Sequence, residues 1–217
     1  MDNAELIAVA TQEIEHPTFG MVEQFLEIHE LVYHAGRPEI AGITVDDVAK
    51  RAIVYFSVKG QAFHFAVQLN TESEIQVYGA DTEDFCRVSF AAYSENMSLQ
   101  QLAGLTNLTP SDSYDKGDKL GIGEMTANGS SLEFQPNPEP GAAEGKLKKL
   151  LTFLEQDVAG VKKLIDEAGG TIEVHAVFHN GNTMLGGIHL DKEDIQRLAA
   201  LNLDIDFDLY AAGNSFK

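Results

Sequence analysis

Three carboxylates occupy every second position near the end of the chain, at Asp204, Asp206 and Asp208. In an extended strand, alternate side chains share one face and lie about 6.6 Å apart. Such a row suits a hard cation, a basic surface of another protein, or a solvated face with cross-strand pairing, and all three interpretations stay open. A calcium EF-hand is excluded, because Leu209 stands where that loop requires glycine and Ser215 where it requires glutamate.

Histidines are the second source of chemistry. His175 and His179 share one face of a predicted strand, but four residues separate them by about 13 Å, which is too far for one zinc ion. The single cysteine, Cys86, offers no second thiolate, and no nucleophile elbow, Walker loop or His-Glu-x-x-His motif is present. We therefore expect no cofactor, no metal and no catalytic residues. The alternative is a small metal-dependent hydrolase or another enzyme with a site near Asp204, Asp206 and His175.

The elements that must position these residues are clearest in the last third of the chain. Leucines and valines at steps of three and four predict one long helix over residues 146–168, which Gly169 and Gly170 end. Alternating polarity predicts two strands, with a helix opened by the N-cap Asp191 between them: residues 171–179 and 203–210. In the last strand we expect the opposite face to enter the core: Leu203, Ile205, Phe207 and Leu209.

The segment before the long helix completes a second unit. Residues 85–93 and 131–135 read as strands, and a turn-rich stretch lies between them at 108–118. Ser98 and Gln101 have the spacing of a capping box and predict a short helix. The resulting order of strands and helices permits a ferredoxin-like core.

The first 83 residues predict helices followed by strands. Helices are expected at 3–15 and 19–35, and Thr44 is expected to cap a short third helix. Strands that form an antiparallel meander are expected afterwards: residues 52–58, 61–69 and 74–79. The prediction is an α+β protein with a helix-plus-meander unit at 1–83 and a mixed sheet with a long helix packed on one face at 84–217.

Residues 84–217 resemble a bacterial family known as domain of unknown function 4279. A Pro-x-x-x-Tyr-x-Lys-Gly-Asp segment carries the resemblance most specifically: Pro110, Tyr114, Lys116, Gly117 and Asp118. The final strand is similar as well, through Leu201, Leu203, Asp204, Ile205 and Asp206. The resemblance implies a fold and a bacterial origin, and it brings no catalytic residues with it. The N-terminal unit lies outside it.

Charge is the strongest compositional signal. The chain carries 15 basic and 34 acidic residues, for a net charge of −19. The charge is spread evenly, with −10 in residues 1–83 (4 basic, 14 acidic) and −9 in residues 84–217 (11 basic, 20 acidic). Such a field repels nucleic acid and anionic membranes and attracts basic proteins. Neither a secretory signal nor a membrane-spanning stretch is predicted, so we expect a cytoplasmic protein.

These observations predict an acidic, non-catalytic binding protein, most concretely an immunity protein that neutralises a basic bacterial toxin. Steering is expected from the aspartates of the last strand. Aromatic side chains beside carboxylates are the expected anchors of a lasting complex. The predicted partner-binding residues are Asp204, Asp206, Asp208 and Tyr210 on the last strand, and Asp112, Tyr114 and Asp115 in the turn-rich stretch.

Overall fold

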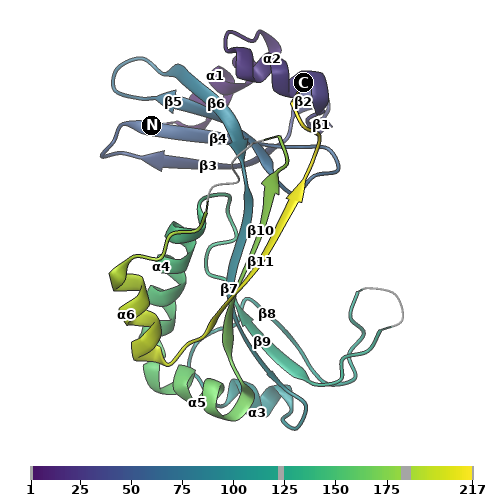
Figure 1. Ribbon diagram of the computed structural model, residues 1–217, viewed down its shortest axis with the longest axis vertical. Coiled ribbons are helices and arrows are strands. Elements are labelled where there is room, and N and C mark those ends of the chain that lie inside the picture. The colour runs from purple at the N-terminus through teal and green to yellow at the C-terminus, as the bar shows by residue number, and fades with distance from the viewer. Residues whose placement is uncertain (1, 122–124, 182–186, 217) are drawn as a thin grey trace.

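The described part of the protein is built around two large β-sheets, each covered by helices on one side (Figure 1). The computed structural model describes residues 2–121, 125–181 and 187–216. The chain leaves the first sheet and enters the second at Asp84, between adjacent strands. Each sheet has its own cluster of buried apolar side chains. The α+β architecture predicted from the sequence is confirmed.

The N-terminal unit packs helices α1 (Asn3–Glu15) and α2 (Gly20–Ile28) on a four-stranded antiparallel sheet. Its strands follow one another in sequence order: β3 (Ile40–Asp46), β4 (Arg51–Ser57), β5 (His64–Asn70) and β6 (Gln76–Glu83). In the core, the Phe25 ring stacks on the Phe65 ring with centroids 4.2 Å apart. The predicted meander is present.

Two helix predictions in this unit are wrong. The helix expected at 19–35 ends at Ile28, and the chain then forms a small hairpin of β1 (Tyr33–His34) and β2 (Arg37–Pro38). Thr44 caps no helix, since it lies inside β3, and its hydroxyl is 3.1 Å from the Tyr55 hydroxyl. In both places, pairing with another strand overrides a local helix signal.

The C-terminal unit contains a five-stranded sheet in the order β11-β10-β7-β9-β8. Its strands are β7 (Phe85–Ser94), β8 (Asp112–Tyr114), β9 (Ser130–Phe134), β10 (Thr171–His179) and β11 (Ile205–Ala212). All neighbours are antiparallel except β10 and β11. The first four strands in chain order have the arrangement of a ferredoxin-like sheet, and β11 extends it at one edge.

Helices cover one face of this sheet: α3 (Leu99–Ala103), α4 (Ala143–Leu154), α5 (Val158–Ala168) and α6 (Lys192–Leu201). The capping box of α3 is formed by Ser98 and Gln101, as predicted. The single long helix expected at 146–168 is instead α4 and α5, separated by a 3-10 turn η1 (Glu155–Asp157). Asp157 restarts the helix by accepting a hydrogen bond from the Gly160 amide at 3.0 Å.

The edge strand β11 differs from prediction in its burial. Leu203, just before the strand, is buried, but Phe207 is 40% exposed and Leu209 is 55% exposed. The reason is position: α4 and α5 pack over the central strand β7, and the sheet ends at β11. Two large apolar side chains of the expected core face therefore stay at the surface.

The chain ends inside the N-terminal unit (Figure 1). Ala212 and Phe216 pack against its core, and the Asn214 side-chain amide donates to the Ile28 carbonyl at 2.9 Å. Near this contact, His29 and His179 bring their Nε2 atoms within 2.9 Å. The two units are thus joined at Asp84 and again at the C-terminus.

Candidate functional site

Among the residues that the structure describes, no helix packs on one face of the five-stranded sheet, and we call it the open face. Burial alternates along β7 and β10, because residues such as Val88 and Val174 point to the helices and their neighbours point away. The registers of the ladders place the following side chains together on the open face: Phe85, Arg87, Ser89, Ala91 and Tyr93 of β7; Asp112 and Tyr114 of β8; Ser131 and Glu133 of β9; Glu173, His175 and Val177 of β10; Asp206, Asp208 and Tyr210 of β11.

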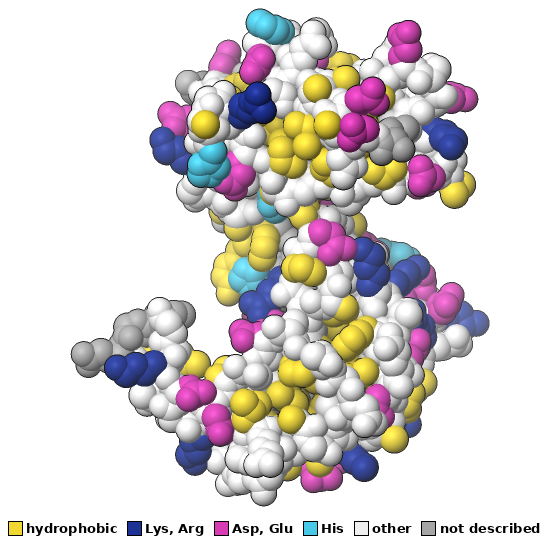
Figure 2. All heavy atoms as spheres, turned by 180° about the vertical axis from the view of Figure 1, so that it is seen from behind, with side chains coloured by type: hydrophobic (Ala, Val, Ile, Leu, Met, Phe, Trp, Pro, Cys, Tyr) yellow, Lys and Arg dark blue, Asp and Glu magenta, His cyan; other side chains and the backbone are white. Residues whose placement is uncertain are grey.

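The open face looks into a hollow of the molecule. Figure 2 shows this hollow between the N-terminal unit and the projecting β8–β9 hairpin, with hydrophobic, histidine, acidic and basic side chains along it. Two shallow depressions lie on the face itself. One, of about 290 Å³, is lined by residues of β7, β10 and β11, and the other, of about 310 Å³, by residues of β7, β8, β9 and β10.

An aromatic cluster lies at the β11 side of the open face. The His175 ring is 5.0 Å from the Tyr210 ring and 5.9 Å from the Phe85 ring, centroid to centroid. Tyr210 is 54% exposed, so its ring offers apolar area together with a hydroxyl. Rings held in this way lose little entropy on binding, which is the property of an anchor residue in a protein interface.

Carboxylates lie beside the aromatic cluster and extend across the open face to β8. The open face carries five acidic side chains: Asp112, Glu133, Glu173, Asp206 and Asp208. Within the described parts of these strands its one cation is Arg87, which forms an ion pair with Glu133 and donates from Nε at 3.1 Å. Four of the five carboxylates therefore have no cation beside them on this face among the described residues, and the face is strongly negative.

Five of the seven residues that the sequence predicted as partner contacts share this face, in two groups on opposite edge strands: Asp206, Asp208 and Tyr210 on β11, and Asp112 and Tyr114 on β8. Asp204 precedes β11, where its carbonyl accepts from the Ile172 amide at 3.0 Å and its side chain is exposed. The Asp115 side chain instead forms hydrogen bonds within the fold. Its carboxylate accepts from the Ser130 hydroxyl at 2.6 Å and from the Leu99 amide at 3.0 Å, and these hydrogen bonds lower its pKa.

Sequence reasoning missed most of the β7 contribution to the site. Phe85, Arg87 and Tyr93 lie in a strand that was predicted, at alternate positions that share a face. This alternation along the predicted strand is the sequence signal that could have identified the three residues. Glu133 and Glu173 were missed for another reason, because only the pairing of β9 and β10 with β7 brings them beside the other charges.

The comparison with known families agrees with the position of this sheet. Residues 84–212 match a family described as "Domain of unknown function (DUF4279)". The chain belongs to the DUF4279 family. The match begins where the chain enters the second sheet and ends at the last residue of β11. No curated protein and no solved structure matches the chain.

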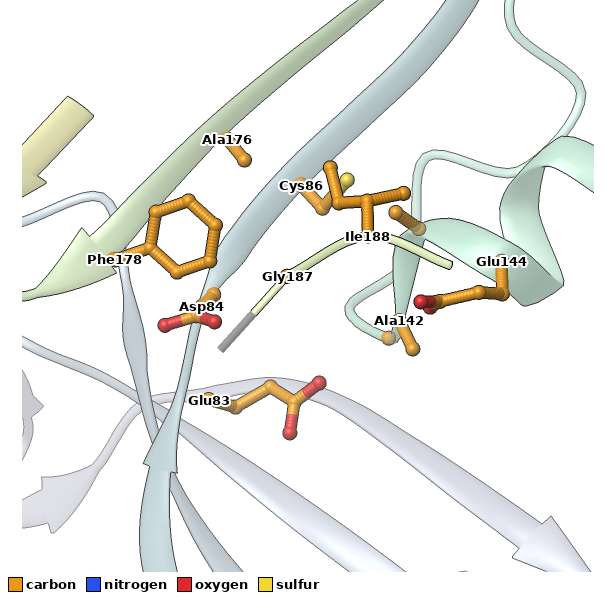
Figure 3. Close-up of a pocket in the computed structure, with 11 residues that line it drawn as sticks. Glu83, Asp84, Cys86, Ala142, Glu144, Ala176, Phe178, Gly187 and Ile188 are labelled. Atoms are coloured by element: carbon orange, nitrogen blue, oxygen red, sulfur yellow. The ribbon is translucent and has the colours of Figure 1, made fainter. Parts of the chain in front are cut away.

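The DUF4279 sheet also borders a small cavity on its helix side, of about 220 Å³ (Figure 3). Glu83 ends β6, Asp84 follows it, and Cys86 lies near the start of β7, while Ala142 and Glu144 come from the start of α4. Burial and the neighbouring carboxylates raise the pKa of Glu83 to about 7, and burial raises the pKa of the Cys86 thiol to about 11. Cys86 is therefore a protonated thiol at neutral pH and lacks the reactivity of a nucleophile.

The residues of the hydrolase alternative are spread along the sheet edge. His175 lies opposite Asp208, Glu173 lies opposite Asp206, and Asp204 precedes the strand. Within residues 2–121, 125–181 and 187–216, His, Cys, Asp and Glu side chains form no group of three or more that could hold a metal ion.

In the same part of the chain, no helix has the length and apolar character needed to cross a membrane.

Proposed function

We propose that this DUF4279 protein is a non-catalytic binding module that captures a basic protein on the open face. The more specific form of the proposal is a cytoplasmic immunity protein that binds and neutralises a bacterial toxin. One observation carries the proposal: a sheet face without a helix layer presents five carboxylates, one paired arginine and an exposed aromatic cluster. A cationic partner gains from the charges during encounter and from the rings after docking.

In this proposal the charges set the association rate and the aromatic contacts set the dissociation rate. Replacement of Asp204, Asp206 and Asp208 by Asn should lower the association rate with a basic partner and flatten its dependence on salt. Steered association exceeds the roughly 10⁵–10⁶ M⁻¹s⁻¹ of unsteered docking, and salt screens the steering. Tyr210→Ala should instead raise the dissociation rate, because it removes the largest exposed ring of the cluster.

Surface plasmon resonance at two salt concentrations, with a candidate basic toxin as the partner, tests the proposal. A matched control replaces three exposed glutamates of the N-terminal unit, Glu23, Glu72 and Glu74, by Gln and changes the net charge equally. The control should retain most of the association rate, since its charges are not on the open face. Equal behaviour of the two triple variants would contradict a role for this face.

A further inference from the structure

The outer edge of β11 has no partner strand among the described residues. β11 is the last strand of its sheet, and no strand lies beyond it in the part of the chain that the structure describes (Figure 1). Two hydrogen bonds mark the ends of the ladder between β10 and β11. The Ile172 amide donates to the Asp204 carbonyl at 3.0 Å, and the Asn180 amide donates to the Ala212 carbonyl at 2.7 Å. The register between these two bonds has no bulge.

Those two hydrogen bonds fix which backbone groups point outward. In a parallel ladder, alternate residues direct both their N–H and C=O groups to the same neighbour. Asp206, Asp208 and Tyr210 therefore bond to β10, and the residues between them point away from it: Ile205, Phe207, Leu209 and Ala211. Among the described residues, none of these outward groups has a backbone partner outside the ladder.

The side chains along this edge alternate in chemistry. Asp206, Asp208 and Tyr210 stand on the open face, and Phe207 and Leu209 stand on the opposite face, 40% and 55% exposed. Exposed edge strands are commonly blunted by charged side chains, a proline or a bulge. β11 has no lysine, proline or bulge, and its charged side chains are the two aspartates Asp206 and Asp208, which repel an acidic strand and attract a basic one. A strand that paired with it would meet carboxylates on one face and apolar side chains on the other.

The negative charge of β11 determines which kind of strand can pair with its outer edge. A second copy of this chain, paired antiparallel about the middle of β11, would bring the carboxylates of Asp206 and Asp208 beside those of its partner, and each copy has a net charge of −19. A strand with lysine or arginine at alternate positions and apolar residues between them would place cations beside Asp206 and Asp208. Its apolar residues would cover Phe207 and Leu209.

We infer that β11 receives an extended segment of the basic partner as an added strand, with its cations over the open face and its apolar side chains against Phe207 and Leu209. This inference rests on the proposed function and adds to it the mode of binding. Backbone hydrogen bonds supply affinity in such strand addition, and the alternating side chains supply specificity. The eight residues of β11 offer four outward N–H and four outward C=O groups.

A short peptide tests the inference with the whole protein. The probe is a blocked, fluorescent peptide of four lysines alternating with three valines, and anisotropy at low salt measures its binding. Two versions carry N-methyl groups, on the valine amides or on the lysine amides. An antiparallel strand bonds to β11 through the valine amides and a parallel strand through the lysine amides, so each version is the control for the other.

One of the two methylated peptides should bind at least about tenfold more weakly than the other, because it loses its bonding N–H groups. Equal affinities of the two versions, whether both bind or neither binds, would overturn the inference. A dimer of the protein that dissociates when β11 is blocked would overturn it as well, since the occupant would then be a second copy.

A pair of variants tests the same edge on the protein. The Leu209 N–H points away from β10, so Leu209→Pro keeps the ladder of β11 and removes one outward donor. Leu209→Ala shortens the side chain and keeps that donor. We expect the proline variant to bind the peptide about tenfold more weakly than the alanine variant, with the same circular dichroism spectrum.

The two proposals can fail separately. If both methylated peptides bind alike but binding falls in the triple Asn variant of Asp204, Asp206 and Asp208, the open face binds cations without strand addition. In that case the inference is overturned and the proposed function stands. If one methylated peptide is rejected but the triple variant binds normally, the edge adds a strand without help from charge, and the proposed function is contradicted.

Discussion

At the scale of single residues, the pair His29 and His179 lies outside the open face, and its hydrogen bonds define where the imidazole protons lie. The Gly181 amide donates to His179 Nδ1 at 3.2 Å, and the Asn214 amide donates to His29 Nε2 at 3.3 Å. These two donors require His179 to carry its proton on Nε2, which it donates to His29 Nε2 at 2.9 Å. Both imidazoles are neutral in this arrangement, and a proton added to His29 Nε2 would place two donors face to face.

Burial lowers the pKa of both histidines. The unfolded chain takes up protons on histidine below a pH of about 6.5, before the folded protein does. The pair therefore stabilises the fold above that pH, and this contribution is lost as the pH falls. Glu83 acts in the opposite direction. Its folded pKa is raised to about 7, so its contribution is present at low pH and is lost as the pH rises from about 4.5 toward 7.

We predict that His179→Gln reduces the loss of stability between pH 7.5 and pH 5.5, because it removes one titrating imidazole and keeps an amide donor for His29. Urea unfolding at the two pH values measures this difference, and comparison with the wild type cancels the opposing effect of Glu83. His16→Gln, at an exposed histidine, is the control and should follow the wild type. Parallel pH profiles for His179→Gln and the wild type would refute the prediction.

At the scale of elements, two glycines in neighbouring helices illustrate opposite constraints. A Cβ atom at Gly145 in α4 would meet nothing within 4 Å. At Gly160 in α5, a Cβ atom would lie 2.2 Å from Asp157 Oδ2 and 2.8 Å from the Thr106 Cα. The same Asp157 oxygen accepts hydrogen bonds from the Thr106 hydroxyl and the Asn107 amide, at 2.9 Å and 2.6 Å. Gly160 thus allows α5 to begin against the loop that follows α3.

Alanine should therefore have opposite effects at the two glycines. Gly145→Ala is expected to raise the free energy of unfolding by up to about 1 kcal/mol through helix propensity. Gly160→Ala is expected to lower it by about 1–3 kcal/mol, because Asp157 must leave its position as N-cap. Urea midpoints of the two variants measure the difference. Stabilisation by both substitutions would show that the contact of Asp157 with the loop contributes little.

At the scale of the whole molecule, two cores are joined by two connections. One connection is Asp84, between β6 and β7, and the other is the C-terminal tail with Asn214 and Phe216. The two apolar clusters have no buried residue in common. Each cluster is therefore expected to stabilise its own unit.

We predict that a fragment of residues 84–217 is soluble and unfolds cooperatively in urea. The fragment of residues 84–212 is the matched comparison, because it omits the tail that packs on the missing unit. It should be at least as stable, since Phe216 has no core to enter in the longer fragment. Recovery of both fragments only as aggregates would mean that the two units share one core.

Local signals in the sequence determined most of the helices and strands. The capping box at Ser98 and the N-cap at Asp191 act within a few residues of themselves, and both are present in the structure. The long helix and the Thr44 cap were mispredicted because their outcomes depend on distant partners. Asp157 contacts Thr106, and Thr44 lies in a strand that pairs with β4. A local pattern contains no information about either contact.

For the candidate site, the sequence by itself determined the alternation of carboxylates on the last strand and the excess of negative charge. The tertiary structure alone decided that Asp112 and Asp208 share one face, that Glu133 and Glu173 join them, and that the Asp115 carboxylate is used within the fold. It also decided that Phe207 and Leu209 stay exposed. The physical reason is that strand alternation is a property of the backbone, whereas strand order and the edge of a sheet arise only when distant segments pair.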